Sequence, residues 1–401
     1  MRIVLLNLIG QKPNPVYEIL ESELRKRGHE VIVAEMNEKS EFNWRKNGRV
    51  FATQDMSLAI SLRARGIPVV STLSLQAKKL QSIRQVRAML RELQPDIVQI
   101  NTMKYPELIP LLMPRGIHFA YDIRQINVKM TDKFVGQLKE KLAIFRMFLC
   151  GRFFYDYTFF CHRGAAERVL GEEWPRRSEV IPVAVDDYFL QSGEFIQAPR
   201  DDEPVIFAYV GSLGLIRNLD QLFAAAKILK AEGLNFQMTF TGPDLSNGHY
   251  QKTIDEMGVE SIVKMEGPVP YEAIPEVLSR AHVGLAYVPD RPTWHYQPTI
   301  KVKEYRALGL PILSTDVASH HEFVEDGVNG VMVADSPQGI ADGMRRFIID
   351  RDFLRRSVAN AQSMRAGITW AEVAEMYEDA YVRLMGQNEG MMLMHDVAEL
   401  K

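Results

Sequence analysis

Short apolar runs and amphipathic stretches alternate along the chain in two successive series. The runs are continuous, as in 3–9, which is typical of strands buried on both faces of a parallel sheet. Between them, apolar residues recur at helical spacing, as in 16–28, which ends on the capping residue Gly28. The pattern predicts strands at 3–9, 29–36, 68–72, 96–101, 117–122 and 157–161, then at 205–211, 236–242, 261–267, 283–289, 311–315 and 330–334.

The alternation stops once, between the two series. Residues 186–204 are polar and contain one glycine and two prolines, which predicts an interdomain linker. We therefore expect an N-terminal domain of 1–185, completed by a C-terminal helix in 369–401, and a second domain of 205–368. The predicted fold class is α/β, with two Rossmann-like doubly wound domains facing across a cleft at the carboxyl ends of their strands.

Composition narrows the class of protein. Among the 401 residues the net charge is −3, which argues against binding nucleic acid by bulk charge. The cysteines, Cys150 and Cys161, lie in apolar surroundings, which favours free thiols over a disulfide framework. No apolar run reaches the length of a membrane span or of a secretory signal, so we expect a cytoplasmic protein.

A glycine-containing loop in 209–220, "YVGSLGLIRNLD", joins a predicted strand to a predicted helix. Such loops direct backbone N–H groups and the positive end of a helix toward an anion. Gly211, Ser212 and Arg217 are therefore candidate phosphate contacts. The alternative is an ordinary strand–helix turn with a solvated arginine.

A second candidate site begins the segment 298–315, "PTIKVKEYRALGLPILST". Thr299 is a candidate N-cap of a helix over 300–308, and Lys301 lies in the first turn, where the helix dipole disfavours a cation. Glu304, three residues further on, lies on the same face of the helix as Lys301. Either the two form a surface salt bridge, or Lys301 contacts a diphosphate while Glu304 accepts hydrogen bonds from two sugar hydroxyls.

These segments carry a resemblance. The stretch 298–315 followed by "HEFVEDGVNGVMV" (321–333) resembles the donor-nucleotide segment of glycosyltransferase family 4, whose members have the GT-B fold. The stretches 209–229 and 266–289 are similar to the family's preceding segments. In the N-terminal half, "SELRKRGHEVIV", "QPDIVQIN" and "EVIPVAVDDYF" also fit, so that the resemblance covers nearly the whole chain.

The resemblance implies roles for individual residues. Arg217 matches the family's basic residue on the diphosphate, and Lys301 matches the lysine of the family's "P…K-x-x-E-Y" variant. Glu304 matches the second glutamate of its E-x7-E motif, which holds the ribose. Gly267 and Tyr271 would lie near the nucleobase. Three departures stand out, where the family has a glutamate, an arginine and a glycine-rich loop: Tyr296, Ser212 and Gly10.

The resemblance also implies a reaction. A sugar would pass from a nucleotide-diphosphate donor to a hydroxyl acceptor with retention of configuration, without metal or other cofactor. Arg217 and Lys301 would stabilise the departing phosphates. Rivals are a nucleotide-sugar 2-epimerase, which needs further acid–base carboxylates, and a more distant polysaccharide phosphorylase. A third is a non-catalytic sugar-nucleotide-binding subunit, with which Tyr296 and Ser212 are consistent.

The N-terminal loops are expected to hold the acceptor. Asp122 and Arg124 follow a predicted strand and are candidates for contact with the reacting sugar, although Asp122 is equally suited to capping its loop. Thr102, Lys104 and Tyr105 lie in an equivalent loop.

Two basic amphipathic segments, 75–93 and 133–154, predict either ordinary half-buried helices or contact with anionic lipid. The family resemblance implies a glycan or lipid-linked acceptor, with envelope glycan assembly at the inner face of the plasma membrane as its commonest setting.

Two acidic or histidine-rich stretches are not expected to bind metal. The "DRD" of 350–352 lies between predicted amphipathic helices, away from any strand end. The "HHE" of 320–322 lacks the i,i+4 histidine spacing of a helical zinc site and more plausibly begins a short helix.

Overall fold

The structure, a computed structural model, describes residues 1–7, 15–36, 42–46, 49–52, 84–101, 110, 116–124, 134–171, 177–192 and 196–398. The chain divides into two compact units. The first comprises Met1–Pro182 with Trp370–Lys401, and the second comprises Val183–Thr369. Each unit is an α/β structure with its own sheet, which confirms the predicted fold class of two Rossmann-like units.

The described strands of the first unit form one sheet in the order β4-β3-β2-β1-β5-β6-β7-β8. Their bounds are β1 Arg2–Asn7, β2 Glu30–Met36, β3 Phe42–Lys46, β4 Arg49–Ala52, β5 Ile97–Asn101, β6 His118–Ile123, β7 Tyr157–Phe160 and β8 Ser178–Val180. Pairing is parallel from β2 to β8, but β3 and β4 form an antiparallel hairpin at the edge. The expectation of an all-parallel sheet was therefore wrong here, because "FNWRK" lacks the apolar run by which buried strands are recognised.

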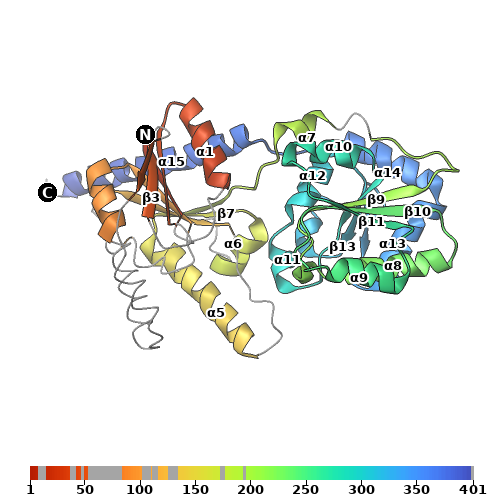
Figure 1. The fold of residues 1–401 in the computed structure, drawn as a ribbon. Coiled ribbons are helices and arrows are strands. Elements are labelled where there is room, and N and C mark those ends of the chain that lie inside the picture. Colours follow the sequence, from red (N-terminus) through yellow and green to blue (C-terminus); the bar gives the residue numbers. More distant parts are fainter. Residues whose placement is uncertain are drawn as a thin grey trace. The chain divides into compact units, whose positions relative to one another are not determined.

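Helices cover both faces of the first sheet, with α1 and α15 on one face and α5 and α6 on the other (Figure 1). Their bounds are α1 Pro15–Lys26, α5 Phe134–Leu149, α6 Arg163–Leu170 and α15 Trp370–Ala398, with a short π-helix at Cys150–Phe154. Buried residues of α15 recur at helical spacing, at Val373, Ala374, Tyr377, Ala380, Tyr381 and Leu384. The final helix therefore belongs to the core of the first unit. The predicted strand 68–72 lies outside the described residues, whereas the part of the basic segment 75–93 that the structure describes, 84–93, is helical.

The second unit has a wholly parallel sheet in the order β11-β10-β9-β12-β13-β14. Its strands are β9 Val205–Val210, β10 Phe236–Thr241, β11 Val263–Gly267, β12 Val283–Ala286, β13 Ile312–Thr315 and β14 Gly330–Val333. The order reverses at β9, since β10 lies on one side of it and β12 on the other. In open parallel sheets such a switch point opens a crevice at the carboxyl ends of the strands.

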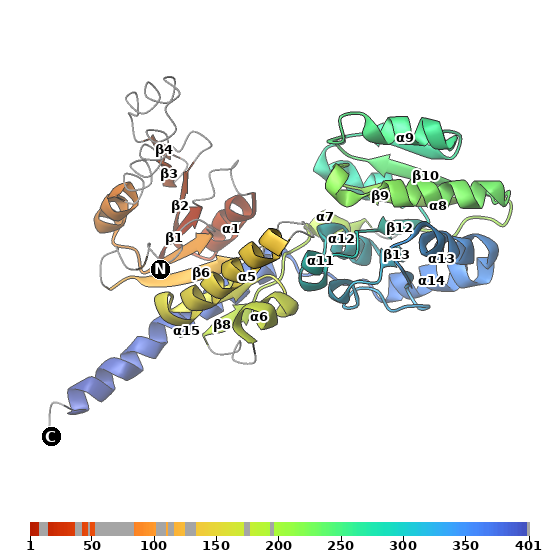
Figure 2. The same ribbon diagram turned by 90° about the horizontal axis from the view of Figure 1, so that it is seen from below.

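Helices also cover both faces of the second sheet, with α8 and α9 on one face and α10 and α12 on the other (Figures 1 and 2). The helices are α7 Asp187–Gln191, α8 Asp220–Ala231, α9 His249–Met257, α10 Ile274–Ser279, α11 Pro292–Tyr296, α12 Ile300–Leu308, α13 Pro337–Ile349 and α14 Arg351–Ser363. Three single 3₁₀ turns join them, η4 Leu215–Arg217, η5 Tyr271–Ala273 and η6 Ala318–His320.

The polar stretch 186–204 differs from the expected linker. It contains α7, and both Phe189 and Ile196 are buried in the core of the second unit. The residue before this stretch is also bonded to the second unit, because the amide of Val185 donates to the carbonyl of Ile368 at 2.9 Å. The apolar side chains of this segment are too irregularly spaced to be recognised by periodicity, yet they fix it to the second unit.

Tyr305 fixes α12 to the centre of the second sheet. The side chain is fully buried, and its hydroxyl accepts from the Val210 amide at 3.2 Å and lies 3.4 Å from the Ala208 carbonyl oxygen. Gly284 on β12 makes room for the ring, because a Cβ there would lie 2.5 Å from Tyr305 Cδ2. The first turn of α12 is thereby held next to the carboxyl end of β9.

A substitution at this contact provides a test of the packing. We expect Gly284→Ala to lower the free energy of unfolding by about 1–3 kcal/mol, because the added methyl group overpacks a buried ring. Chemical denaturation measures the loss. Gly386→Ala is the matched control, since a Cβ there meets nothing within 4 Å, and equal stability of the two variants would contradict the argument.

Candidate functional site

Three loops meet closely at the carboxyl ends of β9, β10 and β11. Gly211 (φ +134°) and Gly242 (φ +148°) both have backbone conformations that favour glycine. A Cβ at Gly242 would lie only 2.1 Å from the carbonyl oxygen of Gly211, and the Gly242 amide donates to the Gly267 carbonyl at 2.8 Å. The backbones therefore form a compact floor, with no room for a side chain at Gly242 and a backbone conformation at Gly211 that a side chain would strain.

Lys301 lies over this floor from the first turn of α12. It is only 6% exposed, and a Cβ at Gly211 would lie 3.7 Å from its Nζ. The ammonium is 3.4 Å from the ring centroid of Tyr209 and has no hydrogen-bond partner among the described residues. Burial, and then the nearby Arg217, lower the pKa of Lys301 well below its usual value.

Glu304, one turn further along α12, is 4% exposed. Its Oε1 accepts a hydrogen bond from the hydroxyl of Tyr271, and burial raises its pKa despite that bond and the charge of Lys301. No ion pair joins Lys301 to Glu304 among the described residues. The alternative of a surface salt bridge is therefore wrong, because both side chains are buried and each faces different groups.

Arg217 brings a second cation to the same place. It ends the turn η4, and its guanidinium carbon lies 4.8 Å from the ring centroid of Trp294. Its Nη1 is buried with no hydrogen-bond partner in the described structure, and no described carboxylate forms an ion pair with it. Two cations that disfavour one another, neither of them in an ion pair with a described carboxylate, form a site electrostatically suited to an anion.

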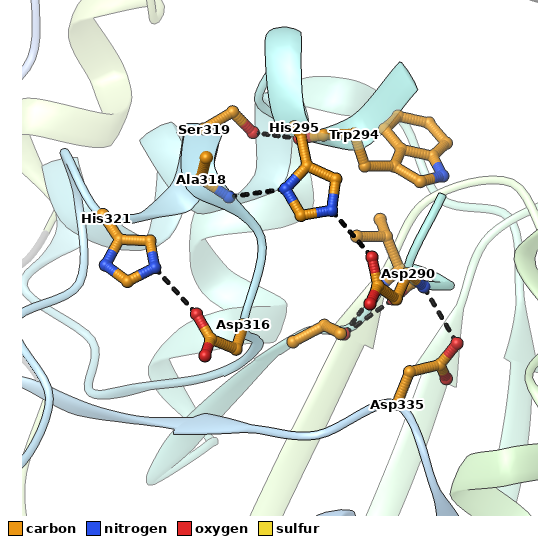
Figure 3. Close-up of polar contacts among 10 residues, drawn as sticks. Asp290, Trp294, His295, Asp316, Ala318, Ser319, His321 and Asp335 are labelled. Carbon is orange, nitrogen blue, oxygen red and sulfur yellow. Dashed lines mark hydrogen bonds and ion pairs between the residues drawn. The ribbon is translucent and has the colours of Figure 1, made fainter. Parts of the chain in front are cut away.

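The segment between β12 and α12 is tied to the loop after β13. His295 bridges the carboxylate of Asp290 at 2.7 Å and the amide of Ala318 at 3.2 Å, and Ser319 donates to the carbonyl of Trp294 (Figure 3). These bonds hold α11 in place, and with it the indole that contacts Arg217.

The remaining residues predicted for this site lie in the same loops and helix ends. Thr299 is the N-cap of α12 as predicted, but its hydroxyl lies 3.4 Å from Nε2 of buried His320 and makes no capping bond. Ser212 follows Gly211 in the floor loop, and partly buried Tyr296 ends α11. Gly267 ends β11 and Tyr271 begins η5, which brings Tyr271 to Glu304.

In the first unit, Asp122 and Arg124 belong to a buried polar network. Asp122 is 2% exposed, and its Oδ2 lies 3.0 Å from Arg124 Nε, 2.9 Å from Gln99 Nε2 and 3.3 Å from the hydroxyl of Tyr17. Arg124 also donates to the hydroxyl of Tyr377 on α15. The network joins strands β5 and β6 to helices α1 and α15 within the unit. Gly10, Thr102, Lys104 and Tyr105 lie outside the described residues.

The two stretches not expected to bind metal have structural partners. Asp350 caps α14 by accepting from the Phe353 amide, and Asp352 pairs with Arg355. The prediction that "HHE" begins a short helix was wrong, because the turn η6 starts at Ala318 and ends at His320. Within the described residues no group of histidine, cysteine and carboxylate side chains is arranged to hold a metal ion.

Sequence reasoning missed Trp294 and Tyr209, the two aromatic partners of the cations. Tyr209 reads as one more apolar residue of a buried strand, and Trp294 stands in a short polar segment with no periodicity. The available signal was the adjacency of each to a recognised motif, since Tyr209 precedes the loop of Gly211 and Trp294 precedes the helix of Lys301.

The chain is similar to known proteins. Residues 192–364 match the family model described as glycosyl transferases group 1. A D-inositol 3-phosphate glycosyltransferase of Nocardia farcinica is 26% identical over 227 residues, a match that covers 53% of this chain and 49% of that protein. The chain thus matches about half the length of that relative.

Solved structures resemble the whole chain. HepE of Anabaena, crystallised in complex with UDP, has a TM-score of 0.64 at 14% identity and covers 96% of this chain and 100% of its own. Sucrose-phosphate synthase of Thermosynechococcus elongatus has a TM-score of 0.66 at 14% identity with the same coverage. At these identities the likeness shows the GT-B fold, and the family model matches less than half of the chain.

Replacement of the buried lysine separates ligand binding from stability. We expect Lys301→Met to raise the free energy of unfolding by about 1 kcal/mol or more, because it removes an uncompensated buried cation from an apolar contact. The unfolded chain has the usual lysine pKa of 10.5, above that of the folded protein. Unfolding therefore takes up a proton between these values, and the wild type gains stability relative to Lys301→Met as pH rises toward 10.5.

Denaturant titrations of both proteins at pH 7 and pH 9 measure this. Lys230→Met is the control, because that ammonium is exposed and bonded to the Gly258 carbonyl. A destabilised Lys301→Met protein would show that Lys301 is a structural residue and would contradict our interpretation.

Proposed function

We propose that the chain transfers a sugar from a nucleotide-diphosphate-sugar donor to a hydroxyl acceptor. The observation that carries the proposal is the pair of cations, Lys301 and Arg217, which lack anionic partners beside a glycine floor at the switch point of a parallel sheet. Free N–H groups at the start of α12 add to the same field. A diphosphate supplies the negative charge that this arrangement lacks.

Glu304 and Tyr271 are suited to the ribose of the donor. A carboxylate offers two acceptor oxygens, and the Tyr271 hydroxyl that donates to Oε1 keeps acceptor capacity of its own. Vicinal hydroxyls of a ribose would donate to both groups. Buried Glu304 would otherwise have little reason to remain charged, since burial raises its pKa.

The chemical step in this proposal is departure of a nucleoside diphosphate. Negative charge grows on the phosphates as the glycosidic bond breaks, and Arg217 and Lys301 would stabilise it. We infer a metal-independent reaction with retention of configuration, supported by the family-4 resemblance of 298–315. A hexosyl donor and a role in envelope or polysaccharide glycan assembly are part of the same proposal.

Donor binding is the direct test. We expect a nucleoside diphosphate among UDP, GDP and ADP to raise the thermal unfolding midpoint, because it binds the native state alone, and we expect the shift to survive EDTA. Arg217→Ala and Glu304→Ala should each weaken this binding at least about tenfold, since each removes a charged hydrogen-bonding group from a buried site.

Matched controls are available on α10, where Glu276 and Arg280 form an exposed pair. Glu276→Ala and Arg280→Ala should bind the nucleotide as the wild type does. Unchanged affinity in the folded Arg217 and Glu304 variants would exclude the site assignment. Binding without turnover of any nucleotide sugar would instead favour a non-catalytic binding subunit.

We also propose that the acceptor is a glycan or a lipid-linked molecule. In this proposal the first unit contacts an anionic membrane surface. Leu142, Phe145 and Phe153 are 57%, 57% and 67% exposed, and exposed Lys141 and Arg152 lie beside them in the sequence. Large apolar residues flanked by cations suit a shallow position among lipid headgroups. No described helix is long and apolar enough to cross a membrane.

Vesicle sedimentation tests this contact. We expect the protein to sediment with vesicles of phosphatidylcholine and phosphatidylglycerol but not of phosphatidylcholine alone, with binding weakened at high salt. The double variant Phe145→Ser/Phe153→Ser should lose most of it. Leu245→Ser, which removes an exposed apolar residue of the second unit, is the control. Equal sedimentation of all three proteins would overturn the membrane proposal.

A further inference from the structure

Arg217 lies at an unusual position for a residue that must present a charge accurately. It ends a single 3₁₀ turn, and the next residue, Asn218, has a left-handed backbone (φ 51°). Neither a carboxylate nor a hydrogen-bond acceptor among the described residues orients the guanidinium. Nearby Lys301 disfavours a second positive charge, since the pKa of Lys301 is lowered by burial and then by the charge of Arg217. Something else must hold Arg217 close to Lys301.

The contact that the structure shows for the guanidinium is the ring of Trp294, at 4.8 Å from the centroid. The negative face of an indole attracts a cation, and a planar guanidinium stacks on it more readily than an ammonium does. The indole Nε1 is buried without a hydrogen-bond partner in the described structure, so its own polar group does not explain its placement.

Trp294 is in turn well fixed. Its carbonyl accepts from Ser319 Oγ, and the neighbouring His295 is bonded on one side to Asp290 and on the other to the Ala318 amide (Figure 3). The short helix α11 is thus tied to the loop after β13 at two successive residues. The indole is therefore a preorganised surface rather than a side chain that follows Arg217.

We propose that Trp294 is a positioning residue for donor binding: its indole holds the guanidinium of Arg217 beside Lys301, where both meet the phosphates of the donor. This inference rests on the proposed function and deepens it, because it assigns the geometry of the anion site to a residue outside the recognised motifs. Without the indole, Arg217 retains its charge and loses its fixed position. Donor binding should then weaken because Arg217 is no longer positioned, and not because Trp294 itself contacts the ligand.

A double-mutant cycle tests the inference. Isothermal titration of the wild type with UDP, GDP and ADP first identifies the nucleotide that binds most tightly. The Kd of that nucleotide is then measured for the wild type, Trp294→Ala, Arg217→Met and the double variant. Trp294→Ala should weaken binding about tenfold, within the range of a desolvated cation–π contact. In the Arg217→Met background the same change should alter Kd less than about twofold. Trp294→Phe, which keeps a ring, should bind within about threefold of the wild type.

A readout without ligand supports the cycle. The difference in fluorescence between the wild type and Trp294→Phe isolates the emission of Trp294 from that of the other tryptophans. Arg217→Met should change that difference spectrum, because the cation on the indole face is removed. An indole that does not contact the guanidinium would not respond to Arg217.

The outcomes are distinct. Wild-type affinity in Trp294→Ala, or an equal loss in both backgrounds, would overturn the positioning role while leaving the proposed function intact. A wild type that binds none of the three nucleotides would overturn the proposed function and this inference together. If Trp294→Ala does not fold, two other measurements decide. Wild-type affinity in Trp294→Leu would overturn the inference. An unchanged tryptophan spectrum in Arg217→Met would also overturn it.

Discussion

A buried lysine without an anionic partner is the constraint around which the second unit is built. Lys301 lies against the ring of Tyr209 and over the backbone of Gly211, where its ammonium has no hydrogen-bond partner and no ion pair among the described residues. Such a group lowers stability unless a ligand supplies the missing charge. Tyr305 and Gly284, by fixing α12 to the sheet, provide the rigidity that keeps the ammonium in this position.

The two units use buried polar groups in opposite ways. In the first, Asp122 accepts hydrogen bonds from Gln99, Arg124 and Tyr17, so that its charge is compensated inside the protein and the bonds join strands to helices. In the second, Arg217 and Lys301 are left without acceptors. Both groups lie at the carboxyl ends of parallel strands. The hydrogen bonds of Asp122 stabilise the fold, whereas the cations without partners in the second unit form a site for a ligand.

Aromatic rings position the cations of the second unit through cation–π contacts. An indole or phenol face is a weak partner compared with a carboxylate, and it leaves the N–H donors of the cation available. Tyr209 and Trp294 can thus position Lys301 and Arg217 without competing with an incoming phosphate. A carboxylate in either place would have held the cation more firmly and would have cancelled the charge on which anion binding depends.

The sequence by itself determined what depends on neighbours along the chain. Periodicity marked the buried strands and main helices, and Thr299 and Gly309 delimited α12, which put Lys301 and Glu304 on one face. Tertiary structure decided what depends on distant residues: the burial of that face, the stacking of Arg217 on Trp294, the hairpin β3–β4, and the attachment of 186–204 through Phe189. The physical reason is that capping and periodicity are local, whereas the environment of a charge is set by segments that only folding brings together.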